Sequence, residues 1–205
     1  HHQFGVEVFG APEATLDAEL IAFALNIFKN IGINDLSVNI NSIGCPACRK
    51  NYNEALMAFL SSKREKLCST CKERLERNPL RVLDCKVPSC REELKDVPVI
   101  LDYLCPECEE HFNNLKLTLD QLGINYKIDP MIVRGPDHYS KTVFEIIYTN
   151  AQNESLTVCG GGRYDGLTGQ MGDVKTAGAG FGMGLERMLK IMSEHRLNFA
   201  RSAGV

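Results

Sequence analysis

The sequence lacks any apolar run long enough to cross a membrane. No stretch approaches the roughly 18 to 20 consecutive apolar residues that a bilayer requires. The N-terminus also lacks a basic region followed by an apolar one, which is the pattern of a secretory leader. We therefore expect no membrane association and a cytoplasmic location.

A strong net charge is missing as well. The chain has 23 basic and 26 acidic residues, for a formal net charge of −3 at pH 7. Such a chain has no global field that attracts a polyanion, so nucleic-acid binding can be argued only from motifs. With 205 residues, of which 44% are hydrophobic, the chain can bury a full core in one large or two small domains. His1 and His2 resemble the remnant of a tag, and we assign them no function.

Strand patterns lie at both ends of the chain. Residues 2–10 alternate apolar and polar side chains, which places Gln3 and Glu7 on the same face of a strand. A helix with one apolar face is expected over residues 14–31, ending at Gly32. Residues 36–41 alternate again and predict a half-buried strand, which we expect to be the neighbour of the first.

The composition changes at Gly44. From there to about Gly123 strand patterns vanish, cysteines come in pairs and helical stretches dominate, and strand patterns then resume. We expect an α+β fold, with a largely antiparallel sheet and flanking helices interrupted by a mostly helical cysteine-rich insertion. The predicted boundaries are 1–43 for the first part of the sheet domain, 44–123 for the insertion and 124–205 for the second part.

Eight of the nine cysteines form four pairs in the sequence. The pairs are Cys45 with Cys48, Cys68 with Cys71, Cys85 with Cys90, and Cys105 with Cys108. The first two pairs have the spacing of a zinc site, because two thiolates on one tight turn offer two tetrahedral corners. Four pairs predict one or two structural Zn²⁺ sites.

The sequence leaves open which pairs combine. One site could hold the first four cysteines, or the pairing could be crossed. Reduced and partly buried thiols are the alternative to metal, and disulfides are disfavoured because nothing marks the chain as secreted.

Three blocks within about fifty residues combine glycine with arginine and aromatic residues. They are RGPDHYSKTVFE (134–145), VCGGGRYDGL (158–167) and GAGFGMGLERML (178–189). Each block alone is a weak indication, because glycine stretches often mark only turns. All three in order are typical of a site that activates a substrate with a nucleotide.

The order of these blocks resembles histidyl-tRNA synthetase, a class II aminoacyl-tRNA synthetase. The first strand resembles the second half of class II motif 2, and GFGMGLERM (180–188) resembles motif 3. RGPDHY and GGGRYDG resemble the two histidine-specific blocks, and the cysteine-rich segment resembles the helical insertion between motif 2 and the first block. The resemblance implies a class II synthetase-type antiparallel sheet. It also implies activation of histidine by ATP with Mg²⁺ and transfer of the histidyl group to tRNA(His).

The resemblance also implies roles for single residues. Arg134 matches the catalytic arginine that contacts the substrate carboxylate and the α-phosphate, and Arg187 matches the motif 3 arginine at the γ-phosphate. A guanidinium can hold two oxyanions in a fork. The residues matched to histidine binding are Glu7 and Tyr139 at the imidazole, Gln3 near the α-amino group, Tyr164 in the pocket wall, and Gly160 and Gly161 where backbone approaches the substrate.

The sequence departs from the family pattern in the loop after Arg134. The family usually has Leu-Asp-Tyr-Tyr after Arg-Gly, whereas this chain has Pro136 and His138 in that stretch. Proline fixes φ and removes a donor, and histidine introduces a titratable ring. Nothing in the sequence matches motif 1, which forms the family's homodimer interface. The early half of motif 2 and an anticodon-binding domain have no match either. We therefore expect this segment alone to be inactive.

Two alternatives to an enzyme fragment remain. A histidine-sensing regulatory subunit of ATP phosphoribosyltransferase would share the resemblance, although the ATP-directed arginines favour the enzyme. The insertion could instead be an RNA-binding zinc module, with Lys63, Arg64 and Lys66 as a basic patch. Its balanced charge favours a solvated helical face instead.

Overall fold

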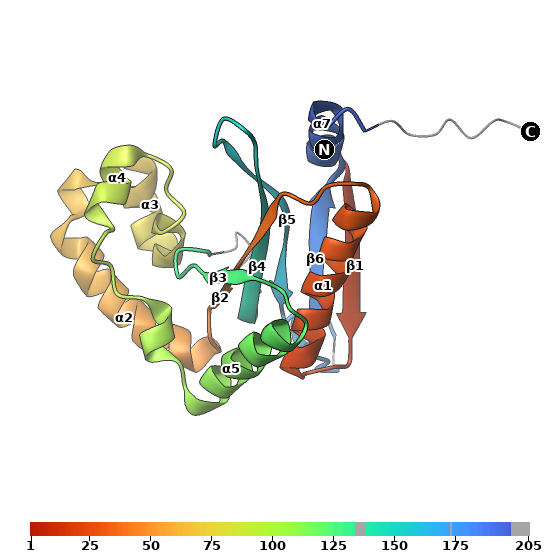
Figure 1. Cartoon of the computed structure of the whole chain (residues 1–205). Coiled ribbons are helices and arrows are strands. Elements are labelled where there is room, and N and C mark those ends of the chain that lie inside the picture. Colours follow the sequence, from red (N-terminus) through yellow and green to blue (C-terminus); the bar gives the residue numbers. More distant parts are fainter. Residues whose placement is uncertain (134–137, 173, 198–205) are drawn as a thin grey trace, which may run out of the picture.

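The computed structural model describes residues 1–133, 138–172 and 174–197. Its centre is a six-stranded sheet with the order β1-β6-β5-β4-β2-β3 (Figure 1). Neighbouring strands are antiparallel except for β2 and β3, which are parallel. The strands are β1 (Gln3–Phe9), β2 (Leu36–Ser42), β3 (Tyr126–Ile128), β4 (Ser140–Thr149), β5 (Ser155–Arg163) and β6 (Gly178–Gly184). This sheet and its helices confirm the predicted α+β class.

The helices fall into two groups, one on the sheet and one in a module that extends away from it (Figure 1). The α-helices are α1 (Ala14–Asn30), α2 (Pro46–Ser62), α3 (Ser69–Arg77), α4 (Pro88–Glu93), α5 (Pro106–Gln121), α6 (Thr168–Met171) and α7 (Leu185–Glu194). The 3-10 helices are η1 (Arg64–Lys66), η2 (Pro79–Val82) and η3 (Ile100–Tyr103). No helix in the described part of the chain has both the length and the apolar character to cross a membrane.

Helix α1 forms as its pattern predicts. Leu20, Ala24 and Phe28 are buried against the sheet, and the helix ends just before Gly32. The φ of Gly32 is +87°, a conformation that glycine adopts without strain and that commonly follows the end of a helix.

Two hydrophobic cores reflect the interrupted sequence. The first lies between the sheet and helices α1 and α5, with residues such as Phe28, Leu115 and Phe181. The second fills the helical module around Tyr52 and Leu56. Helix α5 belongs to the range predicted for the insertion, yet it packs on α1 and shares the core of the sheet. It therefore connects the module to the sheet.

One strand prediction is wrong. We expected residues 36–41 to neighbour the first strand, but β1 pairs only with β6 in the described structure, and β2 pairs with β4 and β3. The two strands run in the same direction, and α1 provides the crossover connection that parallel strands need. An alternating pattern specifies which face of a strand is buried and leaves its neighbour open. Strands from the C-terminal part of the chain fill the space between them.

Candidate functional site

A cleft of about 520 Å³ lies over β1, β6 and β5. The register places Glu7 opposite Gly180, and Gly180 opposite Gly162 on the next strand. Gly182 and Gly160 form the adjacent row, so the cleft floor carries few side chains. Its volume is within the range of ordinary ligand sites.

The glycines act mainly by letting strands and side chains pack closely. A Cβ at Gly180 would collide with the Glu7 carboxylate, and one at Gly161 would collide with the Gly180 carbonyl and lie 2.7 Å from Phe181 Cβ. Gly160 lines the cleft directly, whereas the space beside Gly161 is filled by β6. The pairing of β5 with β4 is irregular at two places. One lies between Thr157 and Cys159, and the other lies where Gly162 and Arg163 meet Val143 and Ser140.

The Glu7 carboxylate and several aromatic rings, Tyr164 and Tyr139 among them, shape the cleft. The Tyr164 hydroxyl donates a hydrogen bond to Glu7 Oε2, and burial together with this carboxylate raises the pKa of Tyr164. The Tyr139 ring centroid lies 6.4 Å from that of Tyr164, and the His138 ring lies 4.9 Å from Tyr139. A carboxylate between aromatic walls suits a flat ring that donates hydrogen bonds. His138, at which this chain departs from the family pattern, therefore lies within the aromatic wall of the cleft.

A smaller pocket of about 140 Å³ adjoins the cleft. Gln3, Gly160 and Gly182 line both, and Arg187 lines the smaller one. Arg187 lies in the first turn of α7, where it is exposed and its guanidinium donates to the Thr157 carbonyl. An exposed guanidinium beside a pocket can bind an anion. Gln3, Glu7, Tyr139, Tyr164, Gly160 and Arg187 thus come together, while Arg134 and Pro136 lie outside the described residues.

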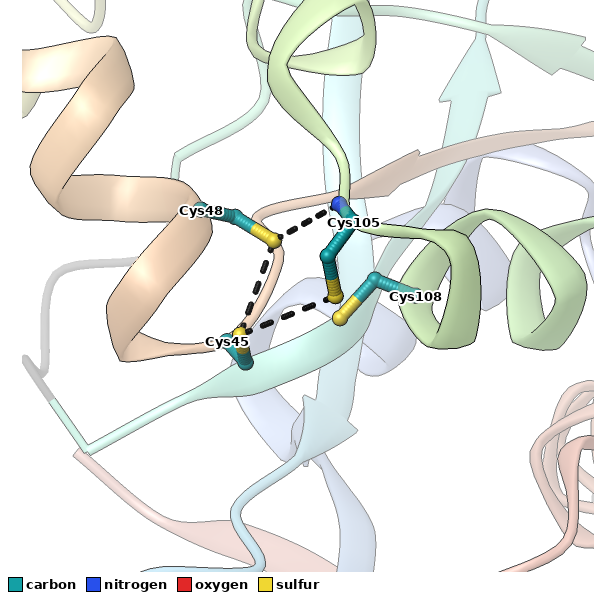
Figure 2. Close-up of side chains that lie close together, drawn as sticks. All are labelled: Cys45, Cys48, Cys105 and Cys108. Carbon is teal, nitrogen blue, oxygen red and sulfur yellow. Dashed lines mark hydrogen bonds between the residues drawn. The ribbon is translucent and has the colours of Figure 1, made fainter.

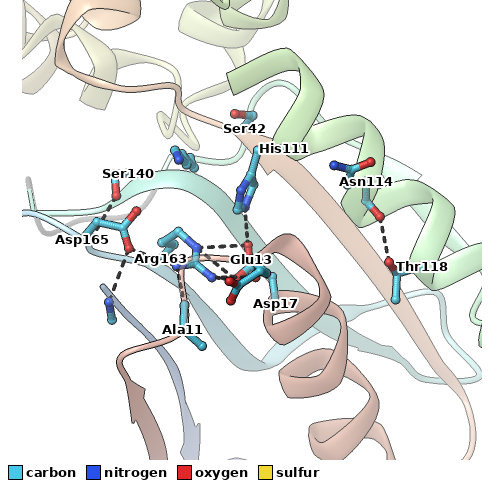
Figure 3. Close-up of polar contacts among 12 residues, drawn as sticks. Ala11, Glu13, Asp17, Ser42, His111, Asn114, Thr118, Ser140, Arg163 and Asp165 are labelled. Atoms are coloured by element: carbon cyan, nitrogen blue, oxygen red, sulfur yellow. Dashed lines mark hydrogen bonds and ion pairs between the residues drawn. The ribbon is translucent and has the colours of Figure 1, made fainter. Parts of the chain in front are cut away.

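A buried ionic network surrounds Arg163, the residue that precedes Tyr164 in the chain (Figure 3). The fully buried Arg163 guanidinium contacts Asp17 at 2.6 Å and Asp165 at 3.0 Å. His111 Nε2 lies 2.8 Å from the second Asp17 oxygen. Burial alone would raise the pKa of Asp17, but the His111 hydrogen bond and the Arg163 charge hold it below its usual value. The network joins α1, α5 and β5.

Sequence reasoning missed this network. The motifs and patterns of the sequence assign no role to Asp17 or His111. The available signal was the position of Asp17 in the buried stripe of α1, between Ala14 and Ile21. A charge in such a stripe requires a buried partner.

The eight paired cysteines form two clusters among the described residues, each with its four sulfur atoms within 4.8 Å of one another. The root cluster is Cys45, Cys48, Cys105 and Cys108, drawn in Figure 2, and the distal cluster is Cys68, Cys71, Cys85 and Cys90. The first pair therefore combines with the fourth, and the second with the third. This nested arrangement excludes the sequential pairing in which the first four cysteines share a site.

Both clusters fit a tetrahedral thiolate site. Zn–S bonds of about 2.3 Å in a tetrahedron place sulfurs about 3.8 Å apart. The Cys45 and Cys48 sulfurs are 3.5 Å apart, and those of Cys68 and Cys85 are 4.0 Å apart. The backbone N–H of Cys105 donates to Cys48 Sγ at 3.1 Å, which stabilises a thiolate.

Local hydrogen bonds also favour ionised sulfur at one position in each cluster. Burial alone would raise the pKa of Cys45, but the backbone N–H of Cys48 and neighbouring donors lower it to about 7. A hydrogen bond from the backbone of Cys71 lowers the pKa of Cys68 to about 7. Thiolates are the form of cysteine that binds metal.

The basic residues considered for RNA binding are paired with carboxylates. Lys63 and Lys66 both contact Glu93, at 3.6 and 3.1 Å, and Arg64 contacts Glu76 at 2.5 Å. These pairs reduce the positive charge that a phosphate backbone would meet, which favours the solvated helical face.

The chain is similar to proteins of one family along nearly all of its length. The family model described as histidyl-tRNA synthetase matches residues 1–188. A histidine–tRNA ligase of Clostridium botulinum is 55% identical over all 205 residues, which cover 48% of that relative. A histidine–tRNA ligase of Clostridium novyi is 55% identical over 201 residues, which cover 98% of this chain and 47% of that relative. The chain thus spans about half the length of these relatives.

Solved structures show the same fold. The apo histidyl-tRNA synthetase of S. aureus matches with a TM-score of 0.78 and 35% identity, over 99% of this chain and 50% of that one. A Bacillus halodurans structure described as an ATP phosphoribosyltransferase regulatory subunit/histidyl-tRNA synthetase shares the fold at 23% identity, with a TM-score of 0.61 over 97% of this chain and 53% of that one. On the match of its family model and of its fold, this chain belongs to the histidyl-tRNA synthetase family.

Proposed function

We propose that this chain is the part of a histidine–tRNA ligase that binds histidine and activates it with ATP. The observation that carries the proposal is the continuity of two pockets. An aromatic cleft with Glu7 in it shares Gln3, Gly160 and Gly182 with a smaller pocket that Arg187 lines. An amino acid in the first and a nucleotide in the second would meet near the shared residues.

In this proposal the cleft selects histidine by its imidazole. Glu7 and Tyr139 contact the ring nitrogens, Tyr164 closes the wall, and Gln3 contacts the α-amino group. A site built to hydrogen-bond a polar ring rejects apolar analogues, because they leave its own polar groups unpaired. Gly160 keeps the floor free of a side chain beside the substrate, and Gly161 lets β6 pack closely against β5 beneath it.

The proposed reaction is attack of the histidine carboxylate on the α-phosphorus of ATP. A bond forms between a carboxylate oxygen and phosphorus, and the bond to the departing pyrophosphate breaks. Catalysis then consists of aligning the reactants and stabilising charge on the phosphate oxygens. Arg187 is assigned to the γ-phosphate and Arg134 to the α-phosphate and carboxylate, and ATP carries Mg²⁺ as its counterion.

The proposal extends to the partners implied by the family. The histidyl group passes from the adenylate to the 3′ end of tRNA(His), in the cytoplasm, and the full-length protein is a homodimer. Zn²⁺ is the proposed occupant of both cysteine clusters, where it would be structural because four thiolates leave no open coordination position.

Calorimetry with histidine and with ATP, each alone and then together, tests the proposal on the protein expressed from its complete reading frame. We expect the protein to bind both ligands. Glu7→Gln should weaken histidine binding about 10- to 100-fold, because it removes a charged hydrogen-bond partner, and should leave ATP binding unchanged.

Glu19→Gln, an exposed change on α1, is the control and should behave like the unmodified protein. Unchanged histidine affinity in Glu7→Gln would contradict the proposed site. Binding of histidine without any binding of ATP would support the regulatory alternative instead.

A further inference from the structure

The root cysteine cluster lies where the polypeptide leaves the sheet and where it returns. Cys45 and Cys48 begin α2 directly after β2, while Cys105 and Cys108 begin α5, which packs back on the sheet. Figure 2 shows the two pairs pointing toward one another from these two helices. A metal ion bound by this cluster would link the two chain segments that connect the sheet with the helical module. The distal cluster lies wholly within the module.

The first connection from the root cluster to the histidine cleft runs through Arg49. This residue follows Cys48 on α2, and its guanidinium donates a hydrogen bond to the Tyr139 carbonyl. The Tyr139 ring packs closely over Gly162 on β5, where an added Cβ would lie 3.1 Å from Tyr139 Cδ1. The orientation of the first turn of α2 therefore sets the backbone position of a residue in the aromatic wall.

Backbone and side-chain contacts reinforce this connection. The Ile43 N–H donates to the Lys141 carbonyl at 2.8 Å, and the Lys141 N–H donates to the Gly44 carbonyl at 2.9 Å. Lys141 Nζ contacts Glu107, which lies between the two cysteines of α5, at 2.8 Å. Residues next to both cysteine pairs thus contact the segment that carries Tyr139.

A second connection runs along α5. His111 lies one turn beyond Cys108 and contacts Asp17, which is paired with the buried Arg163. Arg163 precedes Tyr164 on the chain, and the Tyr164 hydroxyl donates to Glu7. The position of α5 is therefore coupled through buried charges to Tyr164, the neighbour of Tyr139 in the cleft lining.

We propose that a metal ion in the root cluster holds the histidine cleft in its binding shape, with Arg49 as a positioning residue for Tyr139. The chemical class of the ligand is a divalent ion that prefers four thiolates, for which Zn²⁺ is the natural candidate. The distal cluster stabilises the module and has no such effect. This inference rests on the proposed role of the cleft in histidine binding.

The decisive variant is Arg49→Met, which keeps the length of the side chain and removes its donors without touching a metal ligand. We expect about tenfold weaker histidine binding by calorimetry and a similar rise in KM for histidine, as for loss of one charged hydrogen bond. The KM for ATP and the zinc content should stay unchanged. Arg49→Lys, which keeps a donor, should restore part of the affinity.

Lys50→Met, at the next and exposed position of α2, is the matched control and should bind histidine normally. Two cysteine variants compare the root cluster with the distal cluster. Cys108→Ser should lose one zinc per chain and histidine affinity, whereas Cys71→Ser should lose one zinc and keep that affinity.

Equal histidine affinity in Arg49→Met and the unmodified protein would overturn the inference, as would equal loss of histidine and ATP binding. Equal effects of Cys108→Ser and Cys71→Ser on histidine affinity would also overturn it. Failure of the unmodified protein to bind histidine would instead refute the proposed function on which the inference rests.

Discussion

Asp17 is stable as a buried carboxylate only because two basic groups contact it. Its side chain is 2% exposed, and Arg163 and His111 lie within 2.8 Å of its oxygens. Removing one partner of a buried ion pair leaves the other charge uncompensated. We expect Asp17→Asn to lower the free energy of unfolding by about 3 to 5 kcal/mol at pH 7, measured by urea denaturation.

The same residue predicts a pH dependence. The folded-state pKa of Asp17 is lowered, so its contribution to stability is present above its unfolded-state pKa of about 3.9 and is lost as the pH falls through the folded value. The difference between Asp17→Asn and the unmodified protein should therefore shrink below about pH 4.

Glu76→Gln, which breaks an exposed pair with Arg64, is the control and should cost less than about 1 kcal/mol. An equally small cost for Asp17→Asn would show that the buried network does not stabilise the fold.

At the scale of residues, the sequence predicts positions that depend on local periodicity. The alternation in residues 2–10 places Gln3 and Glu7 on one face, and both line the cleft. Arg163, one of the two partners of Asp17, lies 146 residues away on β5, where no local pattern identifies it. Long-range pairs of this kind depend on tertiary packing and therefore need the structure.

At the scale of elements, the cysteine clusters show which sequence patterns predict the cysteine pairs that combine in one site. The root cluster combines two identical Cys-Pro-x-Cys turns, Cys45 to Cys48 and Cys105 to Cys108, each at a helix start with proline at the first helical position. That shared motif is a signal for the observed pairing. The spacing of the first two pairs also fits a zinc site, yet the structure does not combine them, because spacing measures only distance along the chain.

The clusters predict about two zinc ions per chain by elemental analysis, one for each set of four cysteines. Cys85→Ser and Cys105→Ser should each reduce the zinc content by one. Metal uptake by reduced, metal-free protein should release protons, because burial raises the pKa of the Cys71 and Cys108 thiols and the metal ionises them. If the protein contains no bound metal after purification in a reducing buffer with zinc, the proposed metal sites are refuted.

At the scale of the whole molecule, fold class follows from pattern while strand order does not. Strands appear at both ends of the chain with helices between them, which is enough to predict an interrupted sheet. The place of β2 at the far side from β1 depends on three later strands that pair between them. The glycines of those strands, such as Gly161 and Gly180, permit the close approach that builds the cleft.

Histidine-dependent exchange of pyrophosphate into ATP tests the central claim most directly, because it reports formation of the adenylate. The protein expressed from its complete reading frame should catalyse exchange with histidine and not with other amino acids, and Glu7→Gln should reduce that activity. Exchange absent from a folded protein that binds histidine in calorimetry would contradict the account.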